Sequence, residues 1–397
     1  MESPRLSRFL LQIVAPAVLF SLNLWISWRL LFTEYLPHFG SIEPVFYALA
    51  EFIRTRWPHL NWWPQWFCGM PFSYAYQPLL NYMVAIVSAS SGFSGARSFH
   101  IALALAYSMG PVCLYALVFR LSRRWDASIL AGLLYSLWSP STILMSDMAT
   151  DTGGIWNARR LHSAVVWGDG PQVAGLTLVP IAILLFDWAL DRGHPARWFA
   201  ASLAIAAVVA TNIPAAISLA MGMLAYVLSS DARPYFRAPL ALIGASAFGY
   251  LLIAWWIPPS ALWTNVVNAQ WMDTTARFDR GKMFEFVAAG AGLLAVSQAL
   301  GQLHLPRHLR FAFLFTVISS AIVLGNAWFK VSLLAQAGRF HLVMEMAIVT
   351  AVAALAVELA DQWKWGRRVL IVLTLLACAI QIMHYRKRHA ESLQAPT

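Results

Sequence analysis

Charged residues are scarce in this chain of 397 residues, because Asp, Glu, Lys and Arg together make up only 12% of it. An average soluble domain contains about 25% of these residues. Hydrophobic residues make up 59% of the chain, and the mean hydropathy is +0.61. So few polar side chains cannot cover the surface of a soluble globule. The shortage of charge therefore excludes a soluble protein and favours one that spans a membrane.

Cysteine is also rare, and the three cysteines, Cys68, Cys113 and Cys378, do not have the spacing of a metal site. The last two lie inside apolar runs, where a free cysteine acts as a small hydrophobic side chain. No disulfide framework is implied. Solenoid repeats, heptads and low-complexity tracts are missing as well, which excludes repeat proteins and coiled coils.

The formal net charge of +10 does not indicate a nucleic-acid partner. Lysine and arginine cluster at the ends of apolar stretches, where anionic headgroups and the positive-inside rule account for them. We therefore expect a lipid bilayer as the partner, and no nucleic acid.

Apolar stretches of about 15 to 25 residues follow one another along the whole chain, which is the pattern of membrane-spanning helices. The pattern predicts an all-α polytopic membrane protein, a single integral membrane domain over 1–397 with about 11 transmembrane helices. The first span, Phe9 to Phe32, reads as a retained anchor rather than a signal peptide. Arg5 and Arg8 precede it, so we expect the N-terminus inside the cell.

Two segments decide the topology. The run from Pro78 to Gly92 is too short for an ordinary span. If it crossed, the basic residues from Arg120 to Arg124 would lie outside, so we expect an interfacial helix on the outer face. The long run from Trp198 to Ser229 is broken at 211–214 by a proline, which predicts two short helices in a hairpin. This count leaves the basic tail 386–388 outside, against the positive-inside rule.

The first outer loop, 33–97, combines juxtamembrane helices, acids and aromatic rings. Glu43 lies a few residues beyond the first span, where a carboxylate could act as a general base on a lipid-carried substrate. The alternative is that Glu43 only caps the following helix. Four aromatic residues could line an entrance for a sugar or lipid, or simply form an interfacial belt: Trp62, Trp63, Trp66 and Tyr74.

The second outer loop, 147–170, concentrates charge in a chain that has little of it. Its adjacent arginines, Arg159 and Arg160, suit phosphate oxygens, and its glycines allow a ligand to approach the backbone closely. Its acids are Asp147, Asp151 and Asp169. The alternative is a solvated loop that ends in a helix start at Gly170 and Pro171.

A third polar site follows at the start of a late span. Arg339 lies at the mouth of the helix, and His341 and Glu345 lie four residues apart on one face. Acids within spans are costly and indicate function, although a hydrogen bond between His341 and Glu345 is the simpler explanation.

At these residues the chain resembles the GT-C superfamily of membrane glycosyltransferases that use polyprenyl-phosphate sugars. It is most similar to bacterial membrane proteins named for a 6-pyruvoyl-tetrahydropterin synthase-related domain. The features that carry the resemblance are the loop acid, the aromatic signature from Trp66 to Leu80, the basic turn from Arg120 to Arg124, Gly168 to Pro171, and Gly338 to His341. In the superfamily the loop acid is usually an Asp, often one of a pair, whereas Glu43 stands alone.

The resemblance implies an inverting transferase that moves a sugar from a polyprenyl phosphate to the hydroxyl of a glycan, lipid or protein at the outer face of a bacterial cytoplasmic (inner) membrane. Glu43 would be the base. Arg339, Arg159, Arg160 and His341 would bind the phosphate of the donor. Asp147, Asp151 or Asp169 would bind the acceptor or a divalent cation such as Mg²⁺ or Mn²⁺. A flippase for lipid-linked glycans and a non-catalytic scaffold remain alternative hypotheses.

Overall fold

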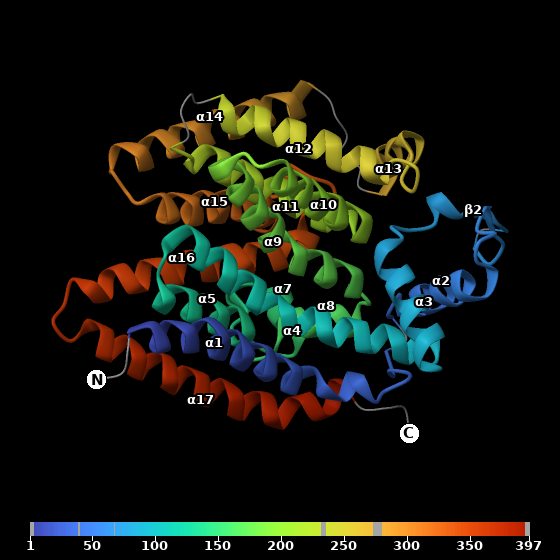
Figure 1. Ribbon diagram of the computed structural model, residues 1–397, viewed down its shortest axis with the longest axis horizontal. Helices are drawn as coiled ribbons and strands as arrows, with labels where there is room; N and C mark the ends of the chain where they lie inside the picture. Colours follow the sequence, from blue (N-terminus) through green and yellow to red (C-terminus); the bar gives the residue numbers. More distant parts are fainter. Residues whose placement is uncertain (1–3, 39, 67, 232–235, 273–279, 394–397) are drawn as a thin grey trace.

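The computed structural model describes residues 4–38, 40–66, 68–231, 236–272 and 280–393. Most of the long helices run side by side along the long axis of the molecule (Figure 1). The main helices are α1 Pro4–Ser27, α2 Glu43–Arg56, α3 Leu79–Ser91, α4 Gly95–Ser122, α5 Trp125–Leu137, α6 Pro140–Leu144, α7 Ser146–Thr152, α8 Arg159–Val166, α9 Gly170–Arg192, α10 Pro195–Thr211, α11 Ile213–Ser229, α12 Arg237–Ile253, α13 Pro259–Met272, α14 Arg280–Gln302, α15 Arg307–Phe329, α16 His341–Asp361 and α17 Gly366–Ser392.

Seven of the described helices are long and apolar enough to cross a membrane, judged by length and composition. They correspond to α1 with the short helix that follows it, α4, α9, α14, α15, α16 with the turn before it, and α17. Four shorter apolar helices, α5, α10, α11 and α12, lie among them in the bundle. The chain is thus an all-helical integral membrane protein, as the sequence predicts, and the count of eleven spans stays a prediction.

The two ends of the bundle differ. One end carries α2, α3, α13 and a small antiparallel hairpin, in which β1 Trp62–Trp63 pairs with β2 Met70–Pro71 (Figure 1). We call it the loop-rich end. The other end carries the turns between α4 and α5 and between α16 and α17, and we call it the ion-pair end because of the contacts described below.

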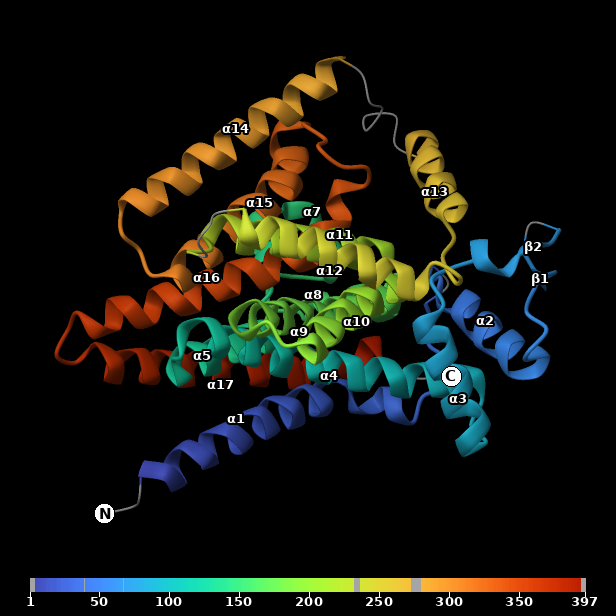
Figure 2. The same cartoon turned by 45° about the horizontal axis from the view of Figure 1, so that its top comes forward.

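The short helix predicted at Pro78 to Gly92 forms as α3. The segment after α1 and the start of α4 meet at the loop-rich end, where Nδ1 of His100 lies 2.8 Å from the carbonyl oxygen of Thr33. Because α1 ends and α4 begins at the same end, α3 between them does not cross the bundle. It lies beside α2 instead, as Figure 2 shows from a second direction.

The predicted helical hairpin is also confirmed. α10 ends at Thr211 and α11 begins at Ile213, and Asn212 between them has an extended backbone. The side chain of Asn212 caps α11 by accepting a hydrogen bond of 2.9 Å from the amide of Ala215. Each helix has 17 residues, or about 25 Å at 1.5 Å per residue. The break brings a polar residue to the loop-rich end.

The first helix begins and the last helix ends at opposite ends of the bundle (Figures 1 and 2). α1 begins at the ion-pair end, and α17 runs from that end towards the loop-rich end, reaching Ser392. The last helix therefore extends beyond its predicted limit of Met383. A chain that crosses a membrane an odd number of times begins and ends on opposite sides. The predicted count of eleven spans is odd and agrees with this placement.

Four arginines at the ion-pair end are paired with acids. Nε of Arg120 lies 2.5 Å from Oδ2 of Asp187, and Arg307 reaches the other oxygen of the same carboxylate at 3.1 Å. Arg310 donates to Asp231 at 2.6 Å. Arg124 contacts Asp126 and Asp361 at 2.8 and 2.7 Å. Each pair joins two helices or fixes a helix end.

Candidate functional site

Glu43 is the first residue of α2, not its cap. The helix is preceded by Ile42, and Pro44 occupies one of the first helical positions, where its missing N–H costs nothing. Oγ of Ser41 accepts a hydrogen bond of 3.3 Å from the amide of Glu43 and so takes part of the capping role. Glu43 is therefore free to use its carboxylate elsewhere.

The carboxylate of Glu43 is buried, with 2% of the residue exposed, and only one of its oxygens has a partner. The hydroxyl of Tyr47, one helical turn along α2, donates to Oε2 at 2.7 Å, and Nε2 of His100 lies 3.3 Å from the same oxygen. Oε1 has no hydrogen-bond partner among the described residues. A buried oxygen without a partner costs about 1–3 kcal/mol, so a ligand that supplies a proton donor would be stabilised here.

Two side chains, Tyr47 and His100, surround Oε2 of Glu43. Nδ1 of His100 must donate to the carbonyl of Thr33, since a carbonyl only accepts. Tyr47 then has one hydroxyl proton and faces two acceptors, Oε2 of Glu43 at 2.7 Å and Nε2 of His100 at 2.9 Å. Burial and the neighbouring Glu43 raise the pKa of Tyr47, so its hydroxyl stays protonated.

The second loop reaches Glu43 at Gly168. This glycine has a φ of +75°, and a Cβ at its position would lie 2.7 Å from the amide of Ile42 and 2.8 Å from the amide of Glu43. The amide of Ile42 also donates to the carbonyl of Trp167 at 3.4 Å. Only glycine fits both the backbone conformation and the close approach. The start of α9, with Gly170 and Pro171 as predicted, follows directly.

A layer of aromatic rings connects Glu43 to Tyr76. Phe46 stacks on Phe99 with ring centroids 5.7 Å apart and meets the edge of Tyr76 at 4.9 Å. The hydroxyl of Tyr76 accepts a hydrogen bond of 2.9 Å from Asn212, at the break between α10 and α11. Burial raises the pKa of Tyr76 to about 12, and the charges of Asp169 and Arg339 act on it in opposite directions. Asp169 and Arg339 therefore lie within electrostatic range of one phenol.

A cavity of about 330 Å³ opens at this point. We call it the Arg339 cavity, because Arg339 is the only charged residue among the described residues that line it. The guanidinium of Arg339 is exposed and makes no hydrogen bond or ion pair with the described residues. The lining comes from Ser73 to Gln77, the start of α11, Ile257, α13, and residues 335–340: Ser73, Tyr74, Ala75, Tyr76, Gln77, Ile213, Pro214, Ile217, Ile257, Ala261, Asn265, Asn268, Ala335, Gln336, Arg339 and Phe340.

Two side chains hold the backbone on either side of Arg339. Nε2 of Gln172 donates to the carbonyl oxygen of Arg339 at 2.7 Å, and Nδ1 of His341 donates to that of Gly338 at 2.7 Å. Since Nδ1 of His341 carries the proton, Nε2 accepts a hydrogen bond of 3.0 Å from Nε of Arg159. His341, which is itself bonded by Arg159, thus holds the backbone segment that carries Arg339.

Arg159 is buried and bonds three side chains. Besides His341, it bonds Asp151, and it donates to Oγ1 of Thr152 at 3.0 Å. Burial opposes ionisation of Asp151, but the hydrogen bonds from Arg159 and from Trp167 outweigh it and lower the pKa of this carboxyl. The structure therefore joins Arg159, Asp151 and His341 in one cluster, in which Arg159 already has a counterion.

Arg160 is separate from that cluster. Its guanidinium lies between the rings of Tyr107 and Tyr135, 3.9 and 4.4 Å from their centroids, and donates to Asn23 at 2.9 Å. A Cβ at Gly110, midway along α4, would lie 2.5 Å from its Nη1. The start of α8 therefore lies in the interior of the bundle, so the second loop is not confined to the surface.

Of the other predicted residues, Tyr74 lines the Arg339 cavity and donates to Ser260 at 2.7 Å, whereas Glu43 is not among the described lining residues. Trp63 is buried, stacks on Trp66 at 5.9 Å and donates to Gln65, whereas Trp62 is exposed and contacts Gly69. None of these three tryptophans lines the cavity. Asp147 is exposed on α7.

His341 and Glu345 do not use each other as partners. His341 bonds Gly338 and Arg159, while Oε1 of Glu345 accepts a hydrogen bond of 2.5 Å from Ser141. Both residues are buried in α16. The simpler sequence explanation, a hydrogen bond between the two, is therefore wrong.

The described residues do not fit a metal site of ordinary composition. No group of three or more His, Cys, Asp or Glu side chains converges within the described ranges. Near Glu43 the one other ligand type is His100, whose Nδ1 is committed to Thr33. The divalent cation implied by the resemblance stays a prediction, and no step below depends on it.

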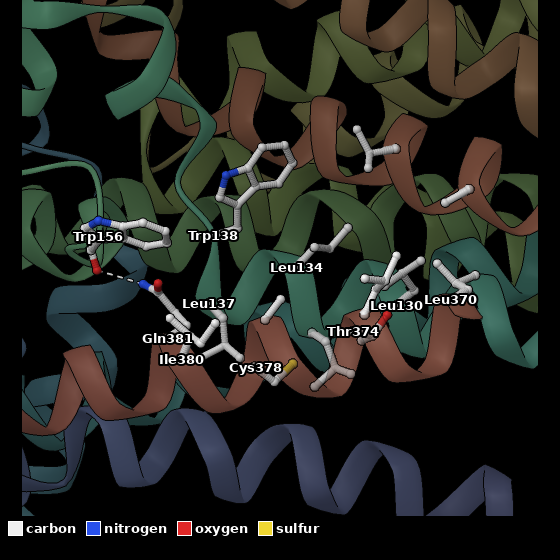
Figure 3. A pocket seen from close by; sticks show the side chains of 15 residues that line it. Leu130, Leu134, Leu137, Trp138, Trp156, Leu370, Thr374, Cys378, Ile380 and Gln381 are labelled. Carbon is white, nitrogen blue, oxygen red and sulfur yellow. Dashed lines mark hydrogen bonds between the residues drawn. The ribbon is translucent and has the colours of Figure 1, made fainter. Parts of the chain in front are cut away.

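A second cavity, of about 470 Å³, lies between α5, α16 and α17 (Figure 3). Its walls are almost entirely apolar, with Leu130, Leu134 and Leu370 along its length. Its polar contact is a hydrogen bond of 2.7 Å from Gln381 to the carbonyl oxygen of Trp156 at one end. No charged residue lines it among those described, and its polar side chains include Thr374 and Cys378.

No protein-family model matches this chain, and no curated protein matches it. Solved structures do. The archaeal oligosaccharyltransferase AglB from Archaeoglobus fulgidus, in complex with an inhibitory peptide and a dolichol-phosphate, superposes with a TM-score of 0.53 at 14% sequence identity. This chain has the GT-C fold. A second structure of the Archaeoglobus fulgidus oligosaccharyltransferase, tethered to an acceptor peptide with the NVT sequon, gives a TM-score of 0.52 at 12% identity.

The match covers 97% and 98% of this chain but 56% of each oligosaccharyltransferase chain. This chain therefore spans a little over half the length of the proteins that it resembles. At this sequence identity, the match shows a shared fold and does not assign a function. The 6-pyruvoyl-tetrahydropterin synthase-related domain stays a prediction.

Sequence reasoning missed four residues that shape the site. Tyr47 lies one helical turn after Glu43, a spacing that places both on the same helix face and was visible in the sequence. His100, Tyr76 and Gln172 come from other elements, and no local pattern pairs them with Glu43 or Arg339.

Proposed function

We propose that this protein is a membrane glycosyltransferase that moves a sugar from a polyprenyl-phosphate donor to an acceptor hydroxyl. The single observation that carries the proposal is the buried carboxylate of Glu43, with one oxygen unpartnered, at the loop-rich end of a GT-C fold. A general base must accept a proton during reaction, and an oxygen already bonded to the protein is less able to do so.

The chemistry needs one base and one group that stabilises the departing phosphate. Oε1 of Glu43 takes the proton of the acceptor hydroxyl as the acceptor oxygen forms a bond to the anomeric carbon. The bond between that carbon and the phosphate oxygen breaks, and the electron pair leaves with the polyprenyl phosphate. Attack opposite the leaving group inverts the anomeric centre. Tyr47 and His100 hold Glu43 in place through Oε2.

Arg339 is the proposed phosphate ligand. Its guanidinium makes no ion pair with the described residues and lies at the Arg339 cavity, whereas Arg159 is bonded to Asp151. An unpaired planar guanidinium suits phosphate oxygens, since it can donate two parallel hydrogen bonds. Asp169, between Gly168 and α9, is the proposed acceptor-binding acid, because it lies near both Tyr76 and Glu43.

We infer the orientation in the membrane from charge. The ion-pair end carries the basic turn of Arg120 to Arg124, which the positive-inside rule assigns to the cytoplasm. The loop-rich end, with Glu43 and Arg339, then faces outward. The donor would be drawn from the outer leaflet of the membrane, and a bacterial inner membrane is the proposed location.

The test is transfer of radiolabelled sugar from synthetic polyprenyl-phosphate donors by purified protein in nanodiscs. Glu43→Gln keeps the shape of the side chain and removes the base, so we expect transfer to fall about 10²- to 10⁴-fold. Glu51→Gln is the matched control. Glu51 lies on the same helix, is exposed and pairs with Arg54, so this variant should transfer at the wild-type rate.

Transfer at the wild-type rate by the Glu43→Gln variant would remove Glu43 as the base. No transfer from any donor by the wild-type protein, with lipid-linked sugar crossing the membrane of proteoliposomes instead, would replace the transferase with a flippase.

A further inference from the structure

We propose that the Arg339 cavity binds the phosphate and one uncharged sugar ring of a monophosphate-linked donor, and that it discriminates against diphosphate-linked, charged and oligosaccharide donors. This inference rests on the proposed function, because it names the class of donor that the same site would take.

The charge of the lining sets the number of phosphates. A sugar linked through one phosphate to a polyprenol is a phosphodiester with one negative charge, and Arg339 is the one charged residue among the described lining. The two charges match. A second phosphate would bring a further negative charge that has no counterion among the described lining residues.

The uncharged polar groups of the lining suit hydroxyl groups. Gln77 and Asn268 present amides that make no hydrogen bond with the described residues, and each amide offers both donors and an acceptor. Asn265 uses its amide nitrogen on Ala261 at 2.9 Å and keeps its oxygen available. Tyr76 accepts from Asn212 and retains its own hydroxyl proton as a donor. Sugar hydroxyls, which both donate and accept, are complementary to this set.

The same lining lacks the partner that a charged sugar would need. No carboxylate lines the described cavity wall, so the ammonium group of an amino sugar finds no counterion there. Arg339 is already assigned to the phosphate, so a uronate has no cation of its own. A charged sugar would be bound less well for this reason alone.

The cavity lining combines polar and apolar residues, which suits the two parts of the donor. Tyr76, Gln77 and Arg339 contribute polar groups from the first loop and from the junction before α16. Ile213, Pro214 and Ile217 contribute apolar surface on α11. A sugar phosphate is complementary to the polar groups, and the first isoprene units of its lipid are complementary to the apolar residues.

The volume limits the sugar. At about 330 Å³ the cavity lies at the lower end of the roughly 300–1,000 Å³ found for small-molecule sites. It accommodates a single ring with its phosphate rather than a chain of several sugars. This distinguishes the proposed donor from that of an oligosaccharyltransferase, the class of enzyme with which this chain shares its fold.

The experiment measures binding, independently of transfer, with full-length protein in nanodiscs. Five radiolabelled farnesyl probes are compared: phosphoryl-glucose, diphosphoryl-glucose, phosphoryl-glucosamine, phosphoryl-glucuronate and phosphoryl-maltotriose. We expect phosphoryl-glucose to bind about tenfold or more tightly than each of the others.

Variants test which residue sets the preference. Arg339→Ala should weaken phosphoryl-glucose about tenfold or more and remove its advantage over the diphosphate, because the single matching cation is gone. Arg97→Ala is the matched control. Arg97 is also an arginine at the loop-rich end, but it lies over the ring of Phe93 and outside the cavity, so binding should not change.

A carboxylate added to the cavity should reverse one preference. Gln77→Glu should weaken phosphoryl-glucose and make phosphoryl-glucosamine the tighter of the two. Asn268→Asp places the same charge on α13, and it keeps the test valid if the first variant does not fold.

Equal or tighter binding of the diphosphate, the maltotriose or either charged probe by the wild-type protein would overturn the inference. So would an unchanged preference in both carboxylate variants. Failure of the proposed function has a different signature. Preferential binding of phosphoryl-glucose without transfer to any acceptor supports the cavity assignment and removes the transferase, whereas transfer from a diphosphate donor keeps the transferase and overturns the cavity assignment.

Discussion

Asp187 at the ion-pair end and Glu43 at the loop-rich end are both buried carboxylates, but only Asp187 has partners on both oxygens. Its Oδ1 is bonded by Tyr226 at 2.7 Å and Arg307 at 3.1 Å, and its Oδ2 by Arg120 at 2.5 Å. Glu43 has partners on Oε2 alone. Two arginines show a similar contrast, since Arg120 bonds two acids while Arg339 bonds none among the described residues.

This difference separates charges that hold helices together from charges that are left for a ligand. In a bundle with little charge, an ion pair between helices replaces contact with water, and its loss leaves a buried charge without a partner. A buried carboxylate oxygen without a partner, such as Oε1 of Glu43, is costly for the protein alone, and the exposed guanidinium of Arg339 is available to an anion. Such groups are expected where a substrate completes the bonding.

The largest expected effect on stability is at the ion-pair end. Asp187→Asn leaves Arg120 and Arg307 with a neutral partner in a buried place, and we expect it to lower the free energy of unfolding by about 3 kcal/mol. Asp191→Asn removes the second acid on Arg120, but that side chain is 54% exposed, so it should cost about 1 kcal/mol or less. Thermal unfolding in detergent measures both. Equal losses in the two variants would contradict the comparison.

A pair of glycines sharpens the comparison. Gly168 and Gly193 both have positive φ, but only at Gly168 would a Cβ meet other atoms, the amides of Ile42 and Glu43. Gly193→Ala should cost about 1 kcal/mol of backbone strain and leave sugar transfer unchanged. Gly168→Ala should cost about 2 kcal/mol or more and also slow transfer, since it displaces Glu43. Unfolding and transfer are measured together, and normal transfer by Gly168→Ala would break the link between the second loop and the site.

Tyr47→Phe tests the support of Glu43 without removing it. The variant loses the hydrogen bond to Oε2, and we expect transfer to fall about tenfold while donor binding is unchanged. Tyr35→Phe is the control, because Tyr35 contacts the ring of Tyr47 but does not bond Glu43 in the described structure. A loss of donor binding equal to the loss of transfer would instead place Tyr47 in the binding site.

The smallest expected effect concerns pH. The pKa of Asp151 is lowered in the folded protein by Arg159 and Trp167, despite partial burial. Its ionised form therefore stabilises the fold above the unfolded pKa of about 4, and this contribution is lost as pH falls through the lower, folded pKa. Unfolding of wild-type protein and Asp151→Asn should differ at pH 7 and converge below pH 4. Asp147→Asn, on an exposed neighbour, should match wild type throughout; a gap between wild type and Asp151→Asn that persists in acid would rule out this cause.

Much of the architecture could be predicted from the sequence, because it depends on local signals. Apolar length predicted the helical bundle, proline after Asn212 predicted the break between α10 and α11, and Gly170 with Pro171 predicted the start of α9. The short run at Pro78 to Gly92 predicted a helix that does not cross.

The pairing of side chains could not be predicted, because it depends on which helices pack together. Two adjacent arginines look equivalent in the sequence, yet Arg159 reaches Asp151 and His341 while Arg160 points between two tyrosine rings. Trp63 is buried although it follows an exposed tryptophan, because the hairpin turns alternate residues to opposite sides. That Arg339 has no acid partner among the described residues is likewise a result of tertiary structure.

The most direct test compares Glu43→Gln with Asp187→Asn in one experiment, with single-turnover sugar transfer normalised to the amount of folded protein. We predict that Glu43→Gln keeps wild-type stability and bound donor but transfers about 10²-fold more slowly or worse, whereas Asp187→Asn unfolds more easily and transfers normally while folded. Normal transfer by Glu43→Gln, or slow transfer by folded Asp187→Asn, would contradict the division between charges for structure and charges for substrate.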